Sequence, residues 1–234
     1  MKKYSLWFTI LVMSNCVAMV LANLLASVAF SFGPFALAGG FIAFPITYVV
    51  SDVVSEAYGY RASRRMCILG QLVTLGSMAL YFIMQTIIGP FADTTFGMYE
   101  VFKSMIATTP FIFIGGIVGS QLGGWINDIV FKAMKHKHLE DGSGYFVRTI
   151  ASSVVGELVD SAAFILIAFL LPHIIGPEFI RAPLGRIIPM IYSQWLFKIV
   201  VETVLFPVTV WLKNKAIAAD GDTFEEGKGY GFAG

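Results

Sequence analysis

Long apolar runs constrain the fold of this chain more than any other feature of its sequence. A transmembrane helix needs about 20 predominantly apolar residues. Hydrophobic residues make up 57% of the 234 residues and charged residues only 13%, well below the share in a soluble domain. Six runs are long and apolar enough, at roughly residues 4–28, 36–58, 66–88, 106–131, 148–171 and 186–212. The sequence therefore predicts an all-α integral membrane protein, a six-transmembrane-helix bundle in which residues 1–217 form a single domain.

The connections and the tail carry breaker residues. Gly-Pro or Pro occurs in the connections near residues 29–35, 89–105 and 172–185, as is typical of segments that interrupt helices. Residues 218–234 are rich in glycine and acidic residues and are predicted to be a disordered cytoplasmic tail.

The first run also has the features of a signal peptide. Lys2 and Lys3 precede the apolar stretch, and Ser27-Val28-Ala29 resembles a cleavage site. The run is longer than a typical signal-peptide core, and Asn15 and Asn23 interrupt it. These two features favour a membrane helix.

Orientation follows from the basic residues. With the N-terminus in the cytoplasm, only Lys103, Arg181 and Arg186 of the 16 basic residues fall in outside segments, and Lys198 falls inside a run. Cytoplasmic loops carry an excess of Lys and Arg, so both termini are predicted to be cytoplasmic.

The second run contains a proline and two carboxylates. Pro45 has no N–H to donate and clashes with the preceding turn, so this helix is predicted to be kinked or broken near Pro45. Asp52 and Glu56 share a face with Tyr48. Glu56 is interpreted as an interfacial residue near Arg61. Asp52 lies one turn deeper, where a charge is costly, and is a candidate functional residue.

The fourth run carries a row of small residues. Gly115, Gly119 and Gly123 fall at i, i+4 and i+8, a pattern that lets another helix approach closely. We expect this row to pack within the bundle or across a homodimer. Gln121 and Asp128 share a different face, which either lines a cavity or anchors the inner interface.

The fifth and sixth runs hold charges that would lie near the middle of the bilayer. Glu157 and Asp160 are three residues apart and face the same way. Two such carboxylates cannot both stay ionised without a cation or strong donors. Gln194, Lys198 and Glu202 fall at i, i+4 and i+8 of the sixth run, and Lys198 is expected to neutralise Asp160. The alternative is a Lys198–Glu202 pair that only holds helices together.

These motifs resemble those of the VUT family of integral membrane proteins, the queuosine precursor transporters. The resemblance implies six helices and uptake of the 7-deazaguanines preQ0 and preQ1, precursors of a modified tRNA nucleoside, across the cytoplasmic (inner) membrane of a prokaryote. Glu157 is less typical of the family pattern than Asp160. The matching residues are Phe44-Pro45, Thr47-Tyr48, Ser51-Asp52, Gly59 through Arg64-Arg65, Gly119-Ser120-Gln121, Asp128, Ile150 through Ser153, Gly156, Asp160-Ser161, Phe164 through Phe169, and Phe197-Lys198.

The residue chemistry agrees with such a substrate. A 7-deazaguanine presents an N–H and an amino group side by side, and a carboxylate accepts from both. Aromatic rings such as Tyr48, Phe164 and Trp195 are candidates to stack on the flat base. The expected substrate-binding residues are Tyr48, Asp52, Gln121, Glu157, Asp160, Gln194, Trp195 and Lys198. Asp160, Lys198 and Glu202 are expected to form the coupling group or ion pair. No metal or cofactor is expected, since Cys16 and Cys67 lie far from any cluster of ligands.

Other functions agree less well with the sequence. A substrate-binding subunit of a vitamin or nucleobase importer, which needs an energising partner, also fits six apolar helices. A membrane enzyme is disfavoured because no protease or hydrolase motif is present. A purely structural scaffold leaves the intramembrane charges without a purpose. Nucleic-acid binding needs a basic surplus, and the formal net charge is only +1.

The predicted orientation is tested with fusions. A reporter that is active only in the cytoplasm, fused after Lys215, should be active because the basic residues favour both termini inside. Periplasmic activity of the matched reporter at this position would contradict the orientation.

Overall fold

The computed structural model describes residues 6–91, 98–135, 144–176, 178 and 181–220. Of the residues singled out in the sequence, Lys2, Lys3 and the side chains of Glu56, Asp128 and Ile150 lie outside this described part, as does the tail beyond residue 220. The helices are α1 (Leu6–Leu25), α2 (Phe44–Tyr58), α3 (Tyr60–Ile87), α4 (Met98–Lys135), α5 (Gly144–Ile165), α6 (Leu171–Ile175) and α7 (Ile187–Asp220).

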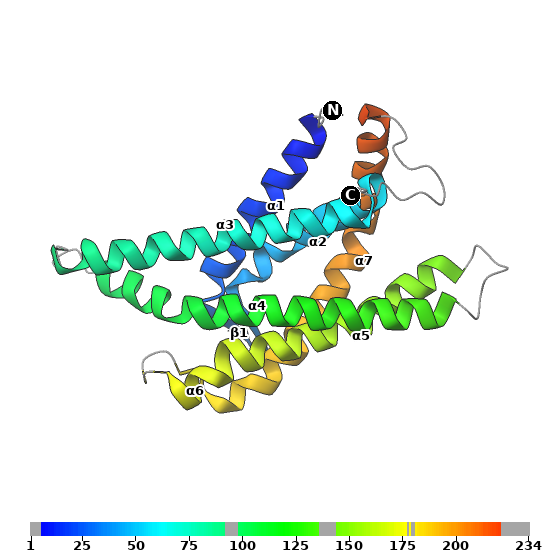
Figure 1. Cartoon of the computed structure of the whole chain (residues 1–234). Coiled ribbons are helices and arrows are strands. Elements are labelled where there is room, and N and C mark those ends of the chain that lie inside the picture. The colour runs from blue at the N-terminus through cyan, green and yellow to red at the C-terminus, as the bar shows by residue number, and fades with distance from the viewer. Residues whose placement is uncertain (1–5, 92–97, 136–143, 177, 179–180, 221–234) are drawn as a thin grey trace. The chain divides into compact units, whose positions relative to one another are not determined.

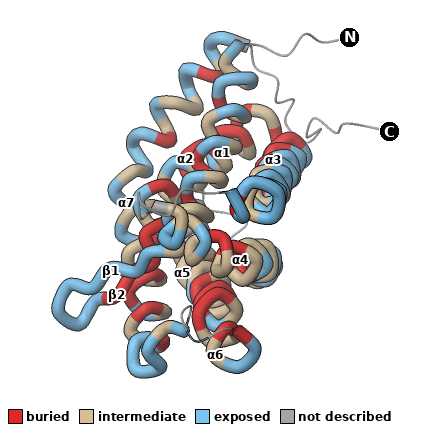
Figure 2. The backbone as a smooth tube through the Cα atoms, turned by 90° about the vertical axis from the view of Figure 1, so that its left-hand side faces the viewer, coloured by how far each residue is buried: buried red, intermediate tan, exposed pale blue. Residues whose placement is uncertain are grey.

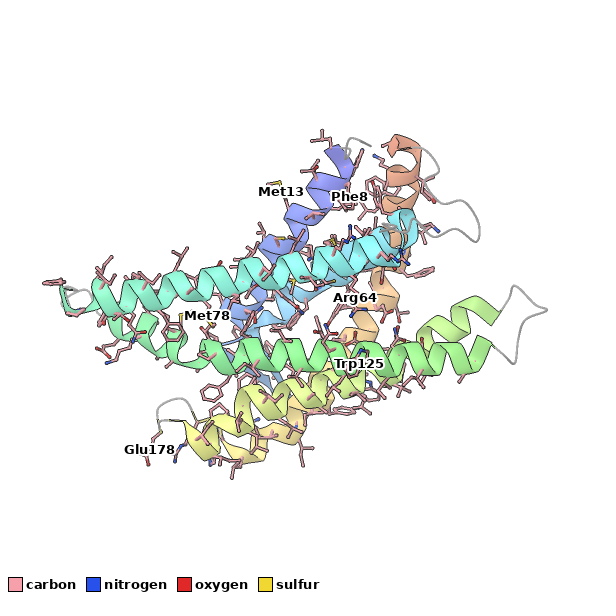
Figure 3. The ribbon with its side chains drawn as sticks, in the orientation of Figure 1. Phe8, Met13, Arg64, Met78, Trp125 and Glu178 are labelled. Atoms are coloured by element: carbon pink, nitrogen blue, oxygen red, sulfur yellow. The ribbon has the colours of Figure 1, made fainter. Side chains whose placement is uncertain are left out.

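Five helical segments among the described residues are long and apolar enough to cross a membrane, which agrees with a multi-pass membrane protein. Their segments are Leu6–Leu25, Arg61–Ile87, Tyr99–Asn127, Ala151–Ile175 and Leu184–Ala219. Large apolar side chains are exposed along these helices, including Met13, which is 62% exposed, and Trp125, which is 60% exposed (Figure 3). Lipid is the solvent in which such exposed apolar surface is stable.

The run expected at 36–58 differs from a single helix. Its first residues belong to β2 (Phe35–Ala38), which pairs antiparallel with the preceding strand β1 (Ala29–Phe32), and the 3-10 turn η1 (Gly39–Ile42) follows. Only then does α2 begin, and its 15 residues span about 22 Å, less than the hydrocarbon core of a bilayer. The expected count of six spans is therefore not confirmed by the described helices.

The hairpin forms because its sequence carries turn chemistry. Phe32 pairs with Phe35, so Gly33 and Pro34 make a two-residue turn, and Gly33 adopts a positive φ of 56° that suits glycine. The turn is exposed (Figure 2), whereas Ala36 in β2 is buried and its N–H donates to Ser193 Oγ of α7 at 3.0 Å. This bond fastens the hairpin to α7.

Pro45 lies at the start of α2 and not within a longer helix. The helix begins at Phe44, so Pro45 occupies its first turn, where the missing N–H costs no hydrogen bond. The prolines inside helices are Pro110 in α4 and Pro207 in α7. The predicted kink within a helix at Pro45 is therefore not confirmed, and the chain instead changes conformation just before this residue.

α4 and α5 run side by side (Figure 1) and form the main helix pair of the described chain. After Ile165, α5 continues through a π-helical segment, η4 (Leu166–Leu170), into α6. Pro172 follows this segment and has no N–H to donate to a carbonyl one turn earlier, which accounts for the irregular hydrogen bonding at this point.

The described residues form two compact units, and each unit draws on segments that are far apart in the sequence. Unit 1 comprises Met1–Ala22, Gly40–Ser77 and Val201–Gly234, and unit 2 comprises Asn23–Gly39 and Met78–Val200. The expectation of a single domain over residues 1–217 stays a prediction. Buried residues form a core in each unit. In unit 1 these are Leu11, Val49, Val50, Val53, Val54, Ala57, Ala62, Met66 and Ala216, and in unit 2 Ala26, Ala36, Ala38, Ile112, Phe164, Ile165, Ala168, Phe169, Ile187 and Met190.

The core of unit 2 is tested at Ile165, which is fully buried. Ile165→Ala leaves a cavity at the α4–α5 side of the unit and should cost about 2–5 kcal/mol of stability. The melting temperature of the purified protein in detergent measures this loss. Leu166→Ala is the matched control, because the neighbouring side chain is 41% exposed and should cost much less. Equal losses in the two variants would contradict the described core.

Candidate functional site

Three charged side chains of unit 2 meet between α5 and α7. Lys198 donates a hydrogen bond to Asp160 Oδ2, and its Nζ also lies 2.7 Å from Glu157 Oε2. We call Glu157, Asp160 and Lys198 the ionic triad. The three residues that the sequence predicted on two separate helices are thus brought together, and Lys198 contacts both carboxylates of α5.

The triad has an accessible side and a buried side. The side chains of Glu157 and Asp160 are 19% and 18% exposed, whereas that of Lys198 is only 4% exposed. The carboxylates therefore lie at the accessible side and the ammonium lies behind them. A ligand that approaches the triad meets hydrogen-bond acceptors with a negative charge, which favours a donor-rich or cationic ligand and disfavours an anion.

Helical spacing and one hydrogen bond place these side chains. Glu157 and Asp160 are three residues apart on α5 and share a face. Trp195 lies less than one turn before Lys198 on α7. It donates its indole N–H to the carbonyl oxygen of Val154 at 2.8 Å. This bond holds α7 against α5 next to the triad. Trp195 therefore has a positioning contact that the sequence did not indicate.

Glycines of α4 form the surface on which Asp160 rests. A Cβ atom added to Gly119 would lie 2.5 Å from Asp160 Oδ1 and 2.9 Å from its carbonyl oxygen. One added to Gly123 would lie 2.7 Å from Asp160 Cβ, and one on Gly115 would lie 3.0 Å from the Phe164 carbonyl oxygen. The glycine row of α4 thus packs against α5 within one chain, and only glycine leaves room for Asp160 there.

On α4, α5 and α7, some buried polar atoms have no hydrogen-bond partner among the described residues. Gln194 Oε1 lies one turn before Lys198 on α7, and the side chain is 3% exposed. Ser161 Oγ follows Asp160 and is fully buried. The third such atom is Asn127 Oδ1. Asn127 belongs to α4 and lies against Gly156 of α5. An unsatisfied buried polar group costs free energy, so each of these atoms is a candidate to accept or donate a further hydrogen bond.

Ser161 and Asn127 were missed in the sequence analysis. A serine beside an intramembrane carboxylate, and an amide one turn after Gly123, are the signals that were available. Neither signal distinguishes a ligand contact from a local hydrogen bond to the helix backbone, which is common for serine in membrane helices.

The other expected site residues lie outside the contacts of the triad described above. Tyr48, Asp52 and Glu202 belong to unit 1, where Tyr48 stacks on Phe44 with ring centroids 6.2 Å apart and Asp52 is exposed. Their part in a common site stays a prediction. Gln121 is exposed on α4, because two residues along a helix turn it away from the face of Gly119 and Gly123.

Phe164 lies in the core of unit 2 and is 3% exposed, with its ring edge-on to Phe169 at 6.2 Å. This packing leaves its face less available for stacking on a substrate than the sequence suggested. No group of three or more His, Cys, Asp or Glu residues within the described part of the chain is placed to hold a metal ion.

The fold and the triad define a multi-pass membrane protein with a cluster of charged side chains between its helices. Comparison with known proteins agrees with this class of protein. The family described as "Putative vitamin uptake transporter" matches residues 38–212, which include α2 through most of α7 and the whole triad. The chain belongs to this family, the VUT family that its motifs resemble. No curated protein and no solved structure shows a significant match to the chain.

The glycine contact is tested at Gly119. Gly119→Ala places a methyl group against the backbone and side chain of Asp160, so α4 or Asp160 must move, at a cost of typically about 1–3 kcal/mol. We expect a lower melting temperature in detergent. Gly124→Ala is the matched control, since nothing lies within 4 Å of a Cβ at Gly124. A Gly119→Ala variant as stable as Gly124→Ala would contradict the packing.

Proposed function

We propose that this protein imports the 7-deazaguanines preQ0 and preQ1 across the cytoplasmic membrane by secondary active transport, and that the ionic triad is the centre of its substrate site. The observation that supports this most is the arrangement of charge in a member of an uptake transporter family. Two partly accessible carboxylates stand in front of one buried lysine. Such a site selects against anions and for a ligand with several donors.

The edge of a 7-deazaguanine has the donors that this site needs. Its ring N–H and amino group lie side by side, and one carboxylate accepts from both, as carboxylates accept from donors on other bases. Asp160 is suited to this role because Gly119 and Gly123 hold it in a fixed place. The triad carries one net negative charge when all three groups are ionised, which also suits the cationic aminomethyl group of preQ1.

The finer organisation belongs to the same proposal. Both termini face the cytoplasm, the membrane is the inner membrane of a prokaryote, and Asp52 and Tyr48 are among the substrate-binding residues. A homodimer remains a prediction, although the glycine row that was one candidate for its interface packs within the chain against α5.

A second function is compatible with the family. Its description names vitamin uptake without an energy source, so the chain is alternatively the substrate-binding subunit of an importer with an energising partner. Reconstitution of the purified chain alone in liposomes separates the two. Uptake without any other protein supports secondary transport, and binding without transport supports the importer subunit.

Removal of either charge of the triad tests the site. Asp160→Asn keeps the shape and removes the charge, and Lys198→Met keeps much of the length. Breaking a buried ion pair typically costs roughly 3–5 kcal/mol, enough to abolish micromolar binding. We expect both variants to lose uptake of labelled preQ1 by cells that cannot synthesise it.

The matched control for these variants is Glu100→Gln. Glu100 pairs with Lys103 at 3.8 Å in an exposed position, so its loss should leave uptake unchanged. Membrane abundance and detergent melting temperature show whether each variant is folded. Folded Asp160→Asn and Lys198→Met proteins that import preQ1 at the wild-type rate would show that the triad is structural.

A further inference from the structure

We propose that Glu157 binds the proton that drives uptake, so that one proton enters with each neutral substrate molecule. This inference rests on the proposed function, because it names the coupling ion of the same site. It starts from the charges that the structure brings together: two carboxylates and one ammonium.

The ammonium group of Lys198 carries one positive charge, and two carboxylates contact it. Lys198 neutralises one carboxylate, and both carboxylates contact the same nitrogen atom, so they lie close to one another. Two adjacent carboxylates in a poorly solvated place resist joint ionisation, and their protonation is coupled. Gly119, Gly123 and Asn127 of α4 lie against this part of α5, and none of the three titrates. Glu202, one turn after Lys198 on α7, also titrates. Because two carboxylates of α5 share the ammonium group of Lys198, the exchangeable proton belongs to this pair.

The contacts assign that proton to Glu157. Asp160 accepts the hydrogen bond of Lys198 and lies against the glycines of α4, so contacts with two helices position it. Glu157 contacts Lys198 at 2.7 Å and has the longer side chain, so it can leave the ammonium group when a proton neutralises it. A proton on Glu157 leaves Asp160 and Lys198 as a neutral pair.

The protonated form of Glu157 matches the substrate better than its ionised form. A guanine-like edge presents a carbonyl oxygen, a ring N–H and an amino group in a row. A protonated Glu157 donates to the carbonyl oxygen while Asp160 accepts from the two donors. An ionised Glu157 would place its negative charge against the carbonyl oxygen. Substrate and proton therefore bind together, which is the requirement for uptake driven by an inward proton gradient.

Two further features concern the substrate and the coupling ion. Gln194 Oε1, 3% exposed and without a partner among the described residues, is a buried acceptor one turn from Lys198 and suits the second amino hydrogen of the base. Lys198 already contacts both carboxylates, so a sodium ion would have to displace its ammonium group, whereas a proton needs no such space. The donor set therefore fits a proton better than a metal cation.

Transport in liposomes tests the coupling, with labelled preQ0 as the neutral probe. Wild-type protein should accumulate preQ0 when the outside is acidic, with proton entry reported by a dye in the lumen. Glu157→Gln keeps a hydrogen-bond donor, but its amide neither binds nor releases a proton at the pH values of the experiment. It should still exchange labelled for unlabelled preQ0, at a reduced rate that no longer depends on pH, and should show neither accumulation nor proton entry. Glu100→Gln is the matched control and should behave as wild type.

Several outcomes would overturn the assignment. These are wild-type accumulation without proton entry, a requirement for sodium, and gradient-driven accumulation by Glu157→Gln. Asp160→Asn should lose exchange as well as accumulation, which separates binding from coupling. If wild-type protein does not exchange preQ0 at all, the proposed function fails, and the proton is then tested without substrate.

Infrared difference spectra of the purified protein supply that independent test. A protonated carboxyl group absorbs apart from an ionised one, so a step from acidic to alkaline buffer should remove a carboxyl band. We expect this band in wild type and in Glu100→Gln and its loss in Glu157→Gln. A wild-type band that persists in Glu157→Gln would place the proton elsewhere and overturn the proposal.

Discussion

The contact of Lys198 with Glu157 and Asp160 is the interaction on which the site depends. Charges within membrane helices are costly unless they meet partners, so a lysine on α7 and two carboxylates on α5 restrict how these helices face each other. The indole N–H of Trp195 fastens the same two helices at Val154. One interface therefore brings charges of opposite sign together and leaves both carboxylates on its accessible side.

The packing of α4 on α5 supports this interface from the other side. Lipid is as apolar as the side chains, so membrane helices associate through close packing, and small residues permit it. Gly119 and Gly123 bring the backbone of α4 up to Asp160, and Gly156 of α5 does the same toward Asn127. The same glycines that join the two helices thus confine the carboxylate that pairs with Lys198.

The sequence predicted long helices well and one apolar run poorly. Periodicity and length identify an apolar segment, but they do not distinguish a spanning helix from a hairpin followed by a shorter helix. Between residues 29 and 43 the deciding features were Gly33-Pro34, which turns the chain, and Gly39, which approaches the backbone of Leu25 too closely for a side chain. Such local requirements outweigh average hydropathy, because backbone groups must be hydrogen-bonded wherever water is absent.

The sequence by itself determined that this is a multi-pass membrane protein of the vitamin uptake transporter family, and it identified the intramembrane charges and the glycine row. Helical spacing also assigned Glu157 and Asp160 to one face. Only the tertiary structure showed that Lys198 contacts both carboxylates, that the glycine row meets Asp160, and that Gln121 points away from it. The physical reason is that periodicity specifies the face of each helix, whereas the neighbour of that face depends on how all the helices pack together.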